Sequence, residues 1–575
     1  MHVGTSAVSV LLGLTVLVGA CSSTGPSAPR TGSEQPQAAP SARKSLAIAL
    51  GGEPEYILMA NLGGGGGTGT ISQNFRLAVH QQLVTYDDRG SILPMLASEV
   101  PSQGDGSWVV RPDGTMQTTY RLRRDVVWHD GAPLTARDFV FAWTVSRDSD
   151  LPLLPTLARR ISRIDTPDDY TLVMEWTDTS PTGNAIVGDE LGPLPTHILA
   201  DAYAADKQRF QQLPYWKRDF VGVGPFRMDN WEPGSHLVLV AHDRFYAGRP
   251  KLDQIVLRFI TSEQTVVADL LANHVDGALD NKAISFTQAM FVKREWERAG
   301  RVALAVVQTT HWRFVGVQFR NPTPRDVLDV RVRRALLHAI DREALVNTVL
   351  EGQAPVSDAF IPPDDPRYGW VRDVIARYPY DVRQSQQLFG DMGWRSGSDG
   401  LYVGADGERV TIPIWTTAGG QSEQELAIIA DAWRNAGVNV DQSVIPEPLM
   451  RDSRARANFL AFDVTSIPLS DENTFRRLHS GACPSEQTRW QGNNRGCYQD
   501  TAMDQSVDAL LHSIDAGQQQ ALLRQIVKTQ TEAVGVLPLY FNINVAIFRQ
   551  GVTGIKGDTS PRTSVSWNAA EWDVT

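Results

Sequence analysis

The alternation of apolar and polar positions between residues 221 and 260 predicts three consecutive strands. Residues 226–231 form the first, and residues 236–241, which are largely apolar and contain β-branched side chains, form the second. The Glu-Pro-Gly-Ser sequence between them is typical of a turn, because Pro fixes φ and Gly permits a positive φ. In the third strand, at 255–259, apolar residues occupy every second position. This segment is expected to be the scaffold against which the rest of the chain folds.

Helical patterns with N-terminal caps lie on both sides of this segment. Thr135 precedes an apolar face that continues to Trp143, which predicts a helix capped by that threonine. Asp329 and Asp341 are predicted to cap two further helices in succession. The first of these two helices also carries three arginines, which are predicted to lie on a solvated face: Arg331, Arg333 and Arg334.

Further strand patterns occur before and after the central segment. Residues 45–50 (SLAIAL) predict a short apolar strand, and residues 160–176 predict a strand pair. Two β-rich stretches, 301–308 and 313–318, are separated by a segment that contains a His-Trp pair. Both stretches are therefore expected to be β-strand.

The later part of the chain alternates between the two types of element. Residues 410–415, 424–436 and 438–444 have the patterns of a strand, a helix and a strand. Because parallel strands need a crossover helix between them, this order indicates an α/β unit with a largely parallel sheet.

Length and composition indicate a large globular protein with more than one lobe. The chain has 575 residues, of which 42% are hydrophobic and 21% charged, so it can bury sizeable cores. Its formal net charge is −11. This charge argues against nucleic acid as a partner, because phosphate binding requires clustered excess Lys and Arg.

The N-terminus has the pattern of an export signal. The apolar run at 8–20 is too short to span a bilayer, and small residues directly precede Cys21, which resembles a bacterial lipobox. The stretch before it holds His2 and no Lys or Arg, so the usual positive charge is missing. We predict a signal peptide at 1–20, then a lipidated cysteine and a flexible tether at 21–44. The alternative is an ordinary secretory signal with a chance cysteine.

The two remaining cysteines are Cys483 and Cys497. In an exported chain such a pair is expected to form a disulfide. The alternative is two buried thiols. Their spacing fits neither a zinc site nor a redox CxxC motif.

Few residues suggest catalysis. The sequence contains no GxSxG, HExxH or Walker A motif and no histidine pair at i, i+4. His129 and Asp130 could form a catalytic pair, but their position in a turn before a helix favours a structural role. The five glycines at 63–67 lack the Lys-Ser or Lys-Thr that closes a phosphate loop. The sequence thus predicts no enzyme, no cofactor and no metal site, while a catalytic pair assembled in space, for which carboxylates such as Asp471 and Glu472 exist, stays open.

Three segments carry a resemblance to a known family. Residues 120–147 (YRLRRDVVWHDGAPLTARDFVFAWTVSR), 221–260 and 325–352 resemble extracellular solute-binding protein family 5, the dipeptide-, oligopeptide- and nickel-binding components of bacterial ABC importers. The resemblance implies an α/β, two-lobed periplasmic-binding-protein fold of type II, in the large class with an extra inserted subdomain. It also implies a ligand cleft between the lobes, which closes about a hinge.

The same resemblance implies how the chain is divided. The core of lobe I is expected to combine residues 45–75, 206–309 and 540–575. Residues 76–205 are expected to be the inserted subdomain of this lobe, and residues 310–539 to form lobe II.

The implied function is that of a substrate-binding lipoprotein of an ABC import system. It would capture a peptide or a similar small solute between its lobes and deliver that solute to permease subunits. The protein is then expected to be a monomer outside the cytoplasm, in the periplasm or on the outer face of the cytoplasmic membrane, and held there by its lipid anchor. An alternative is a transport-independent envelope lipoprotein that uses the same fold as a regulator or a partner-docking protein.

By position in the resemblance, a set of polar and aromatic residues is expected to line the cleft. These are Asn61, His311, Trp312, Trp415, Thr416, Thr417, Asp463, Asp471, Glu472, Tyr540 and Asn542. Trp415 and Tyr540 have a role in the core as an alternative.

The segment 462–475 (FDVTSIPLSDENTF) departs from the pattern of peptide binders. Peptide binders of the family usually carry a Trp and an Asp here, and the Asp pairs with the peptide's N-terminal ammonium. Ser466 and Ile467 stand where the Trp is expected, and Asp471 is the nearest candidate for the Asp, with Glu472 as a substitute. Since a buried carboxylate facing an ammonium is a strong contact, Asp471→Asn is expected to weaken peptide binding about tenfold or more. The missing Trp leaves a sugar, an opine or another solute open beside a peptide.

Overall fold

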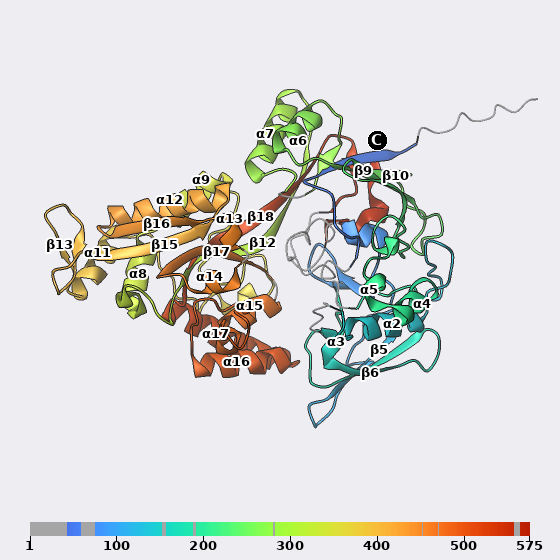
Figure 1. Cartoon of the computed structure of the whole chain (residues 1–575), viewed down its shortest axis with the longest axis horizontal. Helices are drawn as coiled ribbons and strands as arrows, with labels where there is room; N and C mark the ends of the chain where they lie inside the picture. Colours follow the sequence, from blue (N-terminus) through green and yellow to red (C-terminus); the bar gives the residue numbers. More distant parts are fainter. Residues whose placement is uncertain are drawn as a thin grey trace, which may run out of the picture. The chain divides into compact units, whose positions relative to one another are not determined.

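In the computed structural model, Arg43–Thr575 form one compact unit (Figure 1). The structure describes residues 43–58, 75–151, 157–187, 191–279, 282–450, 452–469, 471–556 and 564–575. Several predictions lie outside these residues: the signal peptide, Cys21 and most of its tether, Asn61 and the glycines at 63–67.

A ten-stranded sheet with the order β16-β15-β17-β12-β18-β11-β1-β10-β9-β8 organises the chain. One end of it, here called the meander half, consists of β11 (Gly277–Ala278), β1 (Ser45–Leu50), β10 (Gln254–Phe259), β9 (His236–Ala241) and β8 (Phe226–Glu232). β8, β9 and β10 are antiparallel neighbours, so the three strands predicted between 221 and 260 are confirmed. β1 lies parallel to β10.

The other end of the sheet, here called the parallel half, consists of β16 (Asn439–Ile445), β15 (Thr411–Thr417) and β17 (Phe462–Pro468). β15 is parallel to both neighbours. The crossover helix α12 (Gly420–Asn435) buries Leu426, Ile429 and Trp433. The predicted strand–helix–strand unit is therefore confirmed. Figure 1 shows α9 (Arg342–Leu350) and α12 on one side of these strands, and α16 (Thr501–His512) and α17 (Ala516–Ala533) on the other.

Two long antiparallel strands join the halves: β12 (Leu304–Val317) and β18 (Val536–Phe548). Most of both predicted β-rich stretches, 301–308 and 313–318, is β-strand, and the two are parts of one continuous strand, β12. Its pairing with β18 persists through the His-Trp segment and changes register at two places, between Thr309 and His311 and between Arg313 and Phe314. Irregularities of this kind bend a strand without ending it.

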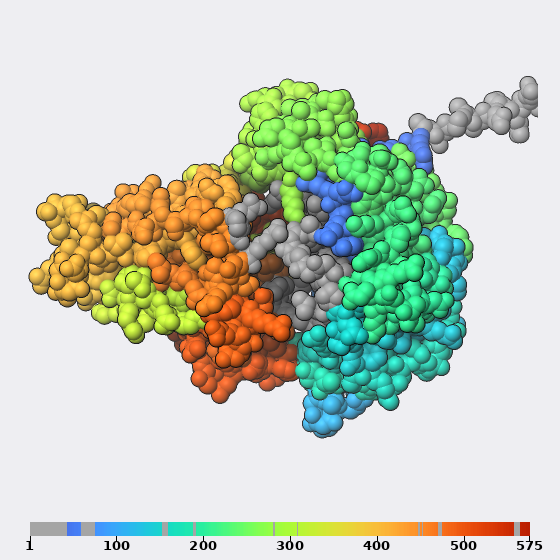
Figure 2. Space-filling model, viewed as in Figure 1, coloured from blue at the N-terminus to red at the C-terminus, as the bar shows by residue number. Residues whose placement is uncertain are grey.

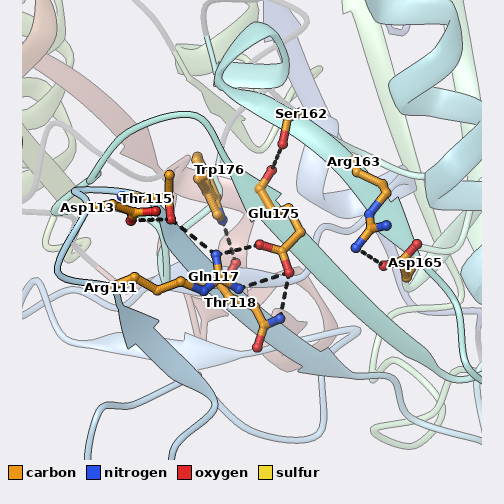
Figure 3. A network of polar contacts seen from close by, with 10 residues as sticks. All are labelled: Arg111, Asp113, Thr115, Gln117, Thr118, Ser162, Arg163, Asp165, Glu175 and Trp176. Carbon is orange, nitrogen blue, oxygen red and sulfur yellow. Dashed lines mark hydrogen bonds and ion pairs between the residues drawn. The ribbon is translucent and has the colours of Figure 1, made fainter.

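A separate four-stranded sheet has the order β4-β5-β7-β6. It consists of β4 (Trp108–Val110), β5 (Met116–Arg121), β7 (Thr171–Trp176) and β6 (Ile161–Asp165). Figure 3 shows polar contacts on this sheet: Arg111 donates to both carboxylate oxygens of Glu175, at 2.8 and 3.0 Å, and Gln117 donates to one of them at 2.7 Å. The pair β6–β7 is the strand pair predicted at 160–176.

Helix α2 (Ala136–Ser146) packs its buried residue Phe139 into the apolar core of this four-stranded sheet. Its N-cap is Thr135, as predicted, although the cap works through Asp138, whose carboxylate accepts the Thr135 backbone N–H at 2.9 Å. Such a contact satisfies a donor that the helix leaves free.

The predicted caps of two later helices are confirmed. The Asp329 carboxylate accepts the Arg331 N–H at the start of α8 (Val330–His338), and Asp341 accepts the Ala344 N–H at the start of α9. The solvated face predicted for the arginines of α8 is wrong for Arg333, which is buried. Its guanidinium donates to the carbonyls of Val534, Val327, Leu328 and Ala533. These hydrogen bonds to backbone carbonyls replace the ones that the Arg333 guanidinium would make with water on a solvated face.

The remaining elements are short strands and peripheral helices. They are β2 (Val84–Tyr86), β3 (Ile92–Pro94), β13 (Arg395–Ser396), β14 (Tyr402–Val403), β19 (Val552–Thr553), β20 (Asp573–Val574), α3 (Leu157–Arg160), α4 (Thr196–Ala205), α5 (Lys207–Phe210), α6 (Glu263–Leu271), α7 (Phe286–Arg298), α10 (Tyr368–Val371), α11 (Val382–Asp391), α13 (Glu447–Met450), α14 (Ser453–Ala457) and α15 (Asp471–Leu478).

Candidate functional site

The two joining strands bring four of the predicted site residues together. His311 lies opposite Asn542, and Trp312 lies opposite Phe541, one residue from Tyr540. Trp312 is fully buried: its indole N–H donates to the Ser357 hydroxyl at 2.8 Å, and its ring packs on Phe314 with centroids 4.7 Å apart. In this structure Trp312 is a core residue, and its contact with a solute stays a prediction.

His311 is an uncharged imidazole at neutral pH. Burial, with a smaller effect of the Arg313 charge, lowers the pKa of His311 to about 4. Its Nδ1 lies 3.0 Å from the Thr310 hydroxyl. His311 can therefore donate or accept a hydrogen bond at the junction of the two halves, but it carries no charge to attract an anion.

Tyr540 and Asn542 belong to a buried polar group that we call the Glu425 network: Arg313, Gln421, Glu425, Tyr540 and Asn542. Arg313 on β12 and Tyr540 on β18 both donate to the Glu425 carboxylate on α12. Gln421, one turn before Glu425, donates to the Tyr540 hydroxyl at 2.7 Å and to the Asn542 side-chain oxygen at 3.0 Å. Burial and the Glu425 charge raise the pKa of Tyr540 far above its usual value. The network thus ties α12 to both joining strands.

Sequence reasoning missed Arg313, Gln421 and Glu425. The sequence offered one signal for Glu425, because it directly precedes Leu426, an apolar residue of the predicted helix. The structure buries both residues on α12. A carboxylate at a buried position is rare unless it is paired. Its partner Arg313 is 112 residues away, so no local pattern could identify the pair.

Three more predicted site residues stand near the C-terminal end of β15. Thr416 is fully buried and donates its hydroxyl to the Val464 carbonyl at 2.8 Å. Trp415 and Thr417 are half-buried and alternate with it. In sheets of this type, ligands bind beyond the carboxyl ends of parallel strands, which favours Thr417 over Thr416 as a ligand contact.

Asp463 lies beside Trp415 in the sheet, since these residues are register partners on β17 and β15. It is only 1% exposed. Burial raises the pKa of its carboxyl above the usual value, against the attraction of Arg456, Arg495 and Arg477. Arg456 is its nearest cation, with Nη2 at 3.7 Å from Oδ2.

Asp471 and Glu472 are the first two residues of α15, but their side chains lie outside what the structure describes. Cys483 and Cys497, which follow α15, are joined by a disulfide, with Cα atoms 4.9 Å apart. The bond closes a segment with a sequence separation of 14. Trp490 lies within it, next to the guanidiniums of Arg320 and Arg454, at 5.3 and 5.4 Å.

The His129–Asp130 pair is structural. The Gly222 N–H donates to His129 Nδ1 at 3.0 Å, so the other ring nitrogen carries the proton and donates to the Gly224 carbonyl at 3.1 Å. Burial lowers the pKa of His129 to about 3. Asp130 pairs instead with His197, at 2.7 Å. These contacts fix the turn to the segment that precedes β8.

Within the described part of the chain, no group of three or more His, Cys, Asp and Glu side chains could hold a metal ion. None of the described helices has the length and apolar character needed to cross a membrane.

A sheet with a meander half and a parallel half, joined by a pair of long antiparallel strands, is the fold of the two-lobed solute-binding proteins. The sequence profile of the bacterial extracellular solute-binding proteins, family 5 (middle region), matches residues 94–478. The chain belongs to this family.

Relatives and solved structures agree with this assignment. The oligopeptide-binding protein AppA of Bacillus subtilis is 23% identical over 442 residues, which cover 76% of this chain and 75% of AppA. Protein XP55 of Streptomyces lividans is 25% identical over 496 residues, 85% of this chain and 81% of that protein. The structure of NikA from Brucella suis in complex with Fe(III)-EDTA superposes with a TM-score of 0.73 at 17% identity, over 92% of this chain and 100% of NikA. AppA from Bacillus subtilis in complex with a nonapeptide gives 0.68 at 19% identity, over 93% and 99%.

Proposed function

We propose that this chain is the solute-capturing component of an ABC import system. The observation that carries the proposal is the family match over residues 94–478, on a fold whose halves are joined by two long strands. Such a joint allows the halves to close on a solute and open again at a permease. The family's relatives are binding proteins of transport systems, and a role without catalysis is part of the proposal.

The solute in this proposal is a peptide or a similar small molecule. AppA, the relative from Bacillus subtilis, is named for oligopeptide binding, but the Trp expected near Ile467 is missing. The cleft residues predicted from position, with Thr417, Asn542, Asp471 and Glu472 foremost, supply the polar contacts. The energy of capture comes mainly from removing the solute from water against a few such contacts.

The division into lobes follows from the same proposal. Lobe I combines residues 45–75, 206–309 and 540–575, with 76–205 inserted, and lobe II comprises 310–539. In this division the lobe boundaries, at 309–310 and at 540, fall on β12 and β18 close to the two register shifts of their pairing. This places the Glu425 network next to the hinge.

A lipid on Cys21 would hold the protein outside the cytoplasm, with residues 22–44 as a tether. Metabolic labelling with a radioactive fatty acid tests this directly. The wild-type chain is expected to incorporate label and Cys21→Ser to remain unlabelled and be released from the membrane fraction. Unlabelled wild-type protein would contradict the lipid anchor, while leaving solute capture unaffected.

Native mass spectrometry of protein purified from its own host tests solute capture, because closed clefts retain their ligand. We expect a bound mass that is lost on unfolding, and reduced import of the identified solute when the gene is deleted. A chain without bound mass, whose deletion changes no import, would contradict the proposal.

A further inference from the structure

Three arginines from three different segments converge on Asp463. This group, Asp463 with Arg456, Arg477 and Arg495, is called the Asp463 cluster. Asp463 lies on β17 between Gly316 of β12 and Trp415 of β15. Its Oδ1 is buried and has no hydrogen-bond partner. The Trp415 side chain lies close enough to favour the ionised form of this carboxyl. A buried carboxylate is costly unless nearby cations compensate it, so the arginines around Asp463 decide what this group can do.

Two of the arginines come from the helices that precede and follow β17 in the chain. Arg456 on α14 lies 3.7 Å from the Asp463 carboxylate, and its own Nε is buried without a hydrogen-bond partner. Arg477 on α15 stacks on the Phe314 ring at 4.0 Å. Its Nη2 would lie 3.4 Å from a Cβ placed on Gly316. The missing side chain at Gly316 thus leaves room for a guanidinium directly beside the Gly316–Asp463 pair.

The third arginine is presented by the segment that the disulfide closes. Gly496 packs so tightly on β12 that a Cβ there would lie 1.9 Å from the Val317 carbonyl oxygen, and its own carbonyl accepts the Phe319 N–H at 2.7 Å. The neighbouring residue, Arg495, is therefore held at the end of β12 and makes no hydrogen bond or ion pair with any described residue. Arg477 donates to the carbonyl of Asn493 in the same segment at 3.0 Å.

The charges of the cluster do not balance. Three guanidiniums face one carboxylate, and Arg477 is only 8% exposed. Burial, with the nearby Arg495, lowers the pKa of Arg477 to about 9, and burial and Arg456 lower the pKa of Arg495. Buried charges are normally paired, because the cost of removing them from water is large. The cluster lacks a negative charge that a bound group could supply.

The cluster is accessible at its rim. Arg495 and Trp415 are half-buried, and Trp415 is the predicted cleft residue at the end of β15. In the space-filling view, the segment that carries α14, α15 and α16 lies at the visible surface (Figure 2). A solute that reaches Trp415 would therefore lie next to the guanidiniums.

We propose that the Asp463 cluster is a subsite for an acidic side chain of the captured solute, in addition to any contact with a terminal carboxylate. The planar fork of a guanidinium matches the two oxygens of a carboxylate. Asp463 holds Arg456 in place, and the unpaired Arg495 contributes a fork at the rim. The inference rests on the proposed solute capture and specifies its substrate class: solutes with an acidic group, such as acidic peptides.

Calorimetry with two matched probes tests this subsite. Ala-Glu-Ala and Ala-Gln-Ala have nearly the same shape and differ in one carboxylate. We expect the wild type to bind the Glu peptide at least about tenfold more tightly, and Arg495→Gln and Arg456→Gln to reduce that ratio below about threefold. Arg489→Gln removes the same charge from an exposed position of the same disulfide-closed segment and is expected to leave the ratio unchanged.

A third probe, sodium glutarate at constant ionic strength, separates the two proposals. Equal binding of both peptides, or a ratio that survives in Arg495→Gln, would overturn the subsite and leave peptide capture intact. If neither peptide binds but glutarate raises the melting temperature of the wild type and not of Arg495→Gln, the subsite stands and peptide capture fails. Absence of any response to all three probes overturns both.

Discussion

The Glu425 network and the Asp463 cluster are two buried charged groups beside the same strand, β12, and they are built in opposite ways. In the first, one arginine and one carboxylate balance, and Tyr540 and Gln421 occupy further hydrogen-bonding positions. In the second, three arginines act on one carboxylate. Each group keeps one buried guanidinium nitrogen without a hydrogen-bond partner, Nε of Arg313 in the first and Nε of Arg456 in the second, so the groups differ in their balance of charge. A group whose charges balance stabilises one arrangement, whereas a group with excess positive charge can accept an anionic partner.

Their positions fit these roles. The Glu425 network connects α12 to β12 and β18 near the register shifts, so its closure fixes the joint between the halves. The Asp463 cluster connects β17 to two helices and the disulfide-closed segment, beside Trp415. The contrast indicates that charge balance distinguishes a structural network from a binding subsite in this protein.

The largest expected effect comes from Glu425→Gln. It leaves Arg313, which is buried beside the lost charge, without a counter-ion, so we expect a loss of about 3–5 kcal/mol in the free energy of unfolding. Urea unfolding measures this. Asp431→Asn on the same helix is the matched control, because its side chain is 72% exposed, and a change of at most about 0.5 kcal/mol is expected. A loss below about 1 kcal/mol for Glu425→Gln would show that the network is not a structural joint.

Removal of the disulfide should distinguish the Asp463 cluster from the Glu425 network. For a sequence separation of 14, Cys483→Ser with Cys497→Ser is expected to cost about 3 kcal/mol in the chain-entropy model. It should also abolish the preference for Ala-Glu-Ala, because the segment that holds Arg495 loosens. The near-ultraviolet circular dichroism of the variant in the absence of peptide is the control for an intact core. A variant that keeps the full preference would contradict the role of this segment.

Asp463→Asn should have a much smaller effect on stability than Glu425→Gln, although both remove one buried carboxylate. Since burial raises the pKa of Asp463, the native state holds its proton more tightly than the unfolded state. The contribution of this group to stability is therefore complete below its unfolded pKa, about 3.9, and is lost as the pH rises through its native pKa. Because this contribution declines as the pH rises, we expect Asp463→Asn to lose less than about 1 kcal/mol at pH 7.

Urea unfolding of Asp463→Asn and the wild type between pH 4 and 8 measures this difference. The variant should gain stability relative to the wild type as the pH rises. A loss in the free energy of unfolding that does not change with pH and is as large as that of Glu425→Gln would mean that Asp463 is a stabilising ion-pair partner. The contrast between the Glu425 network and the Asp463 cluster would then be wrong. Asp441→Asn, at an exposed position of β16, is the control for the loss of an unburied carboxylate.

The smallest expected change in stability belongs to Arg495→Gln. The side chain makes no hydrogen bond or ion pair with the described residues and lies near other cations, so the free energy of unfolding should change by no more than about 0.5 kcal/mol. Urea unfolding measures this. A loss of several kcal/mol would show that Arg495 is a structural residue. The effect of Arg495→Gln on peptide preference would then no longer be evidence for the subsite.

Local patterns in the sequence determined most of the regular elements. The strands at 45–50 and 236–241 and the caps Asp329 and Asp341 were predictable, because side-chain periodicity and capping depend on neighbours within one or two turns. The order of the segments and their resemblance also identified the family.

The tertiary structure decided what long-range contacts determine. β12 continues through its His-Trp segment because β18, more than 200 residues later, provides its hydrogen bonds. Arg333 is buried because distant carbonyls accept its protons, and Arg313 is buried because Glu425 approaches it from another helix. The Asp463 cluster brings side chains of three segments to one carboxylate on a fourth. Local sequence patterns do not determine such contacts. Their stabilising energy arises only when segments that are far apart in the chain are buried against each other.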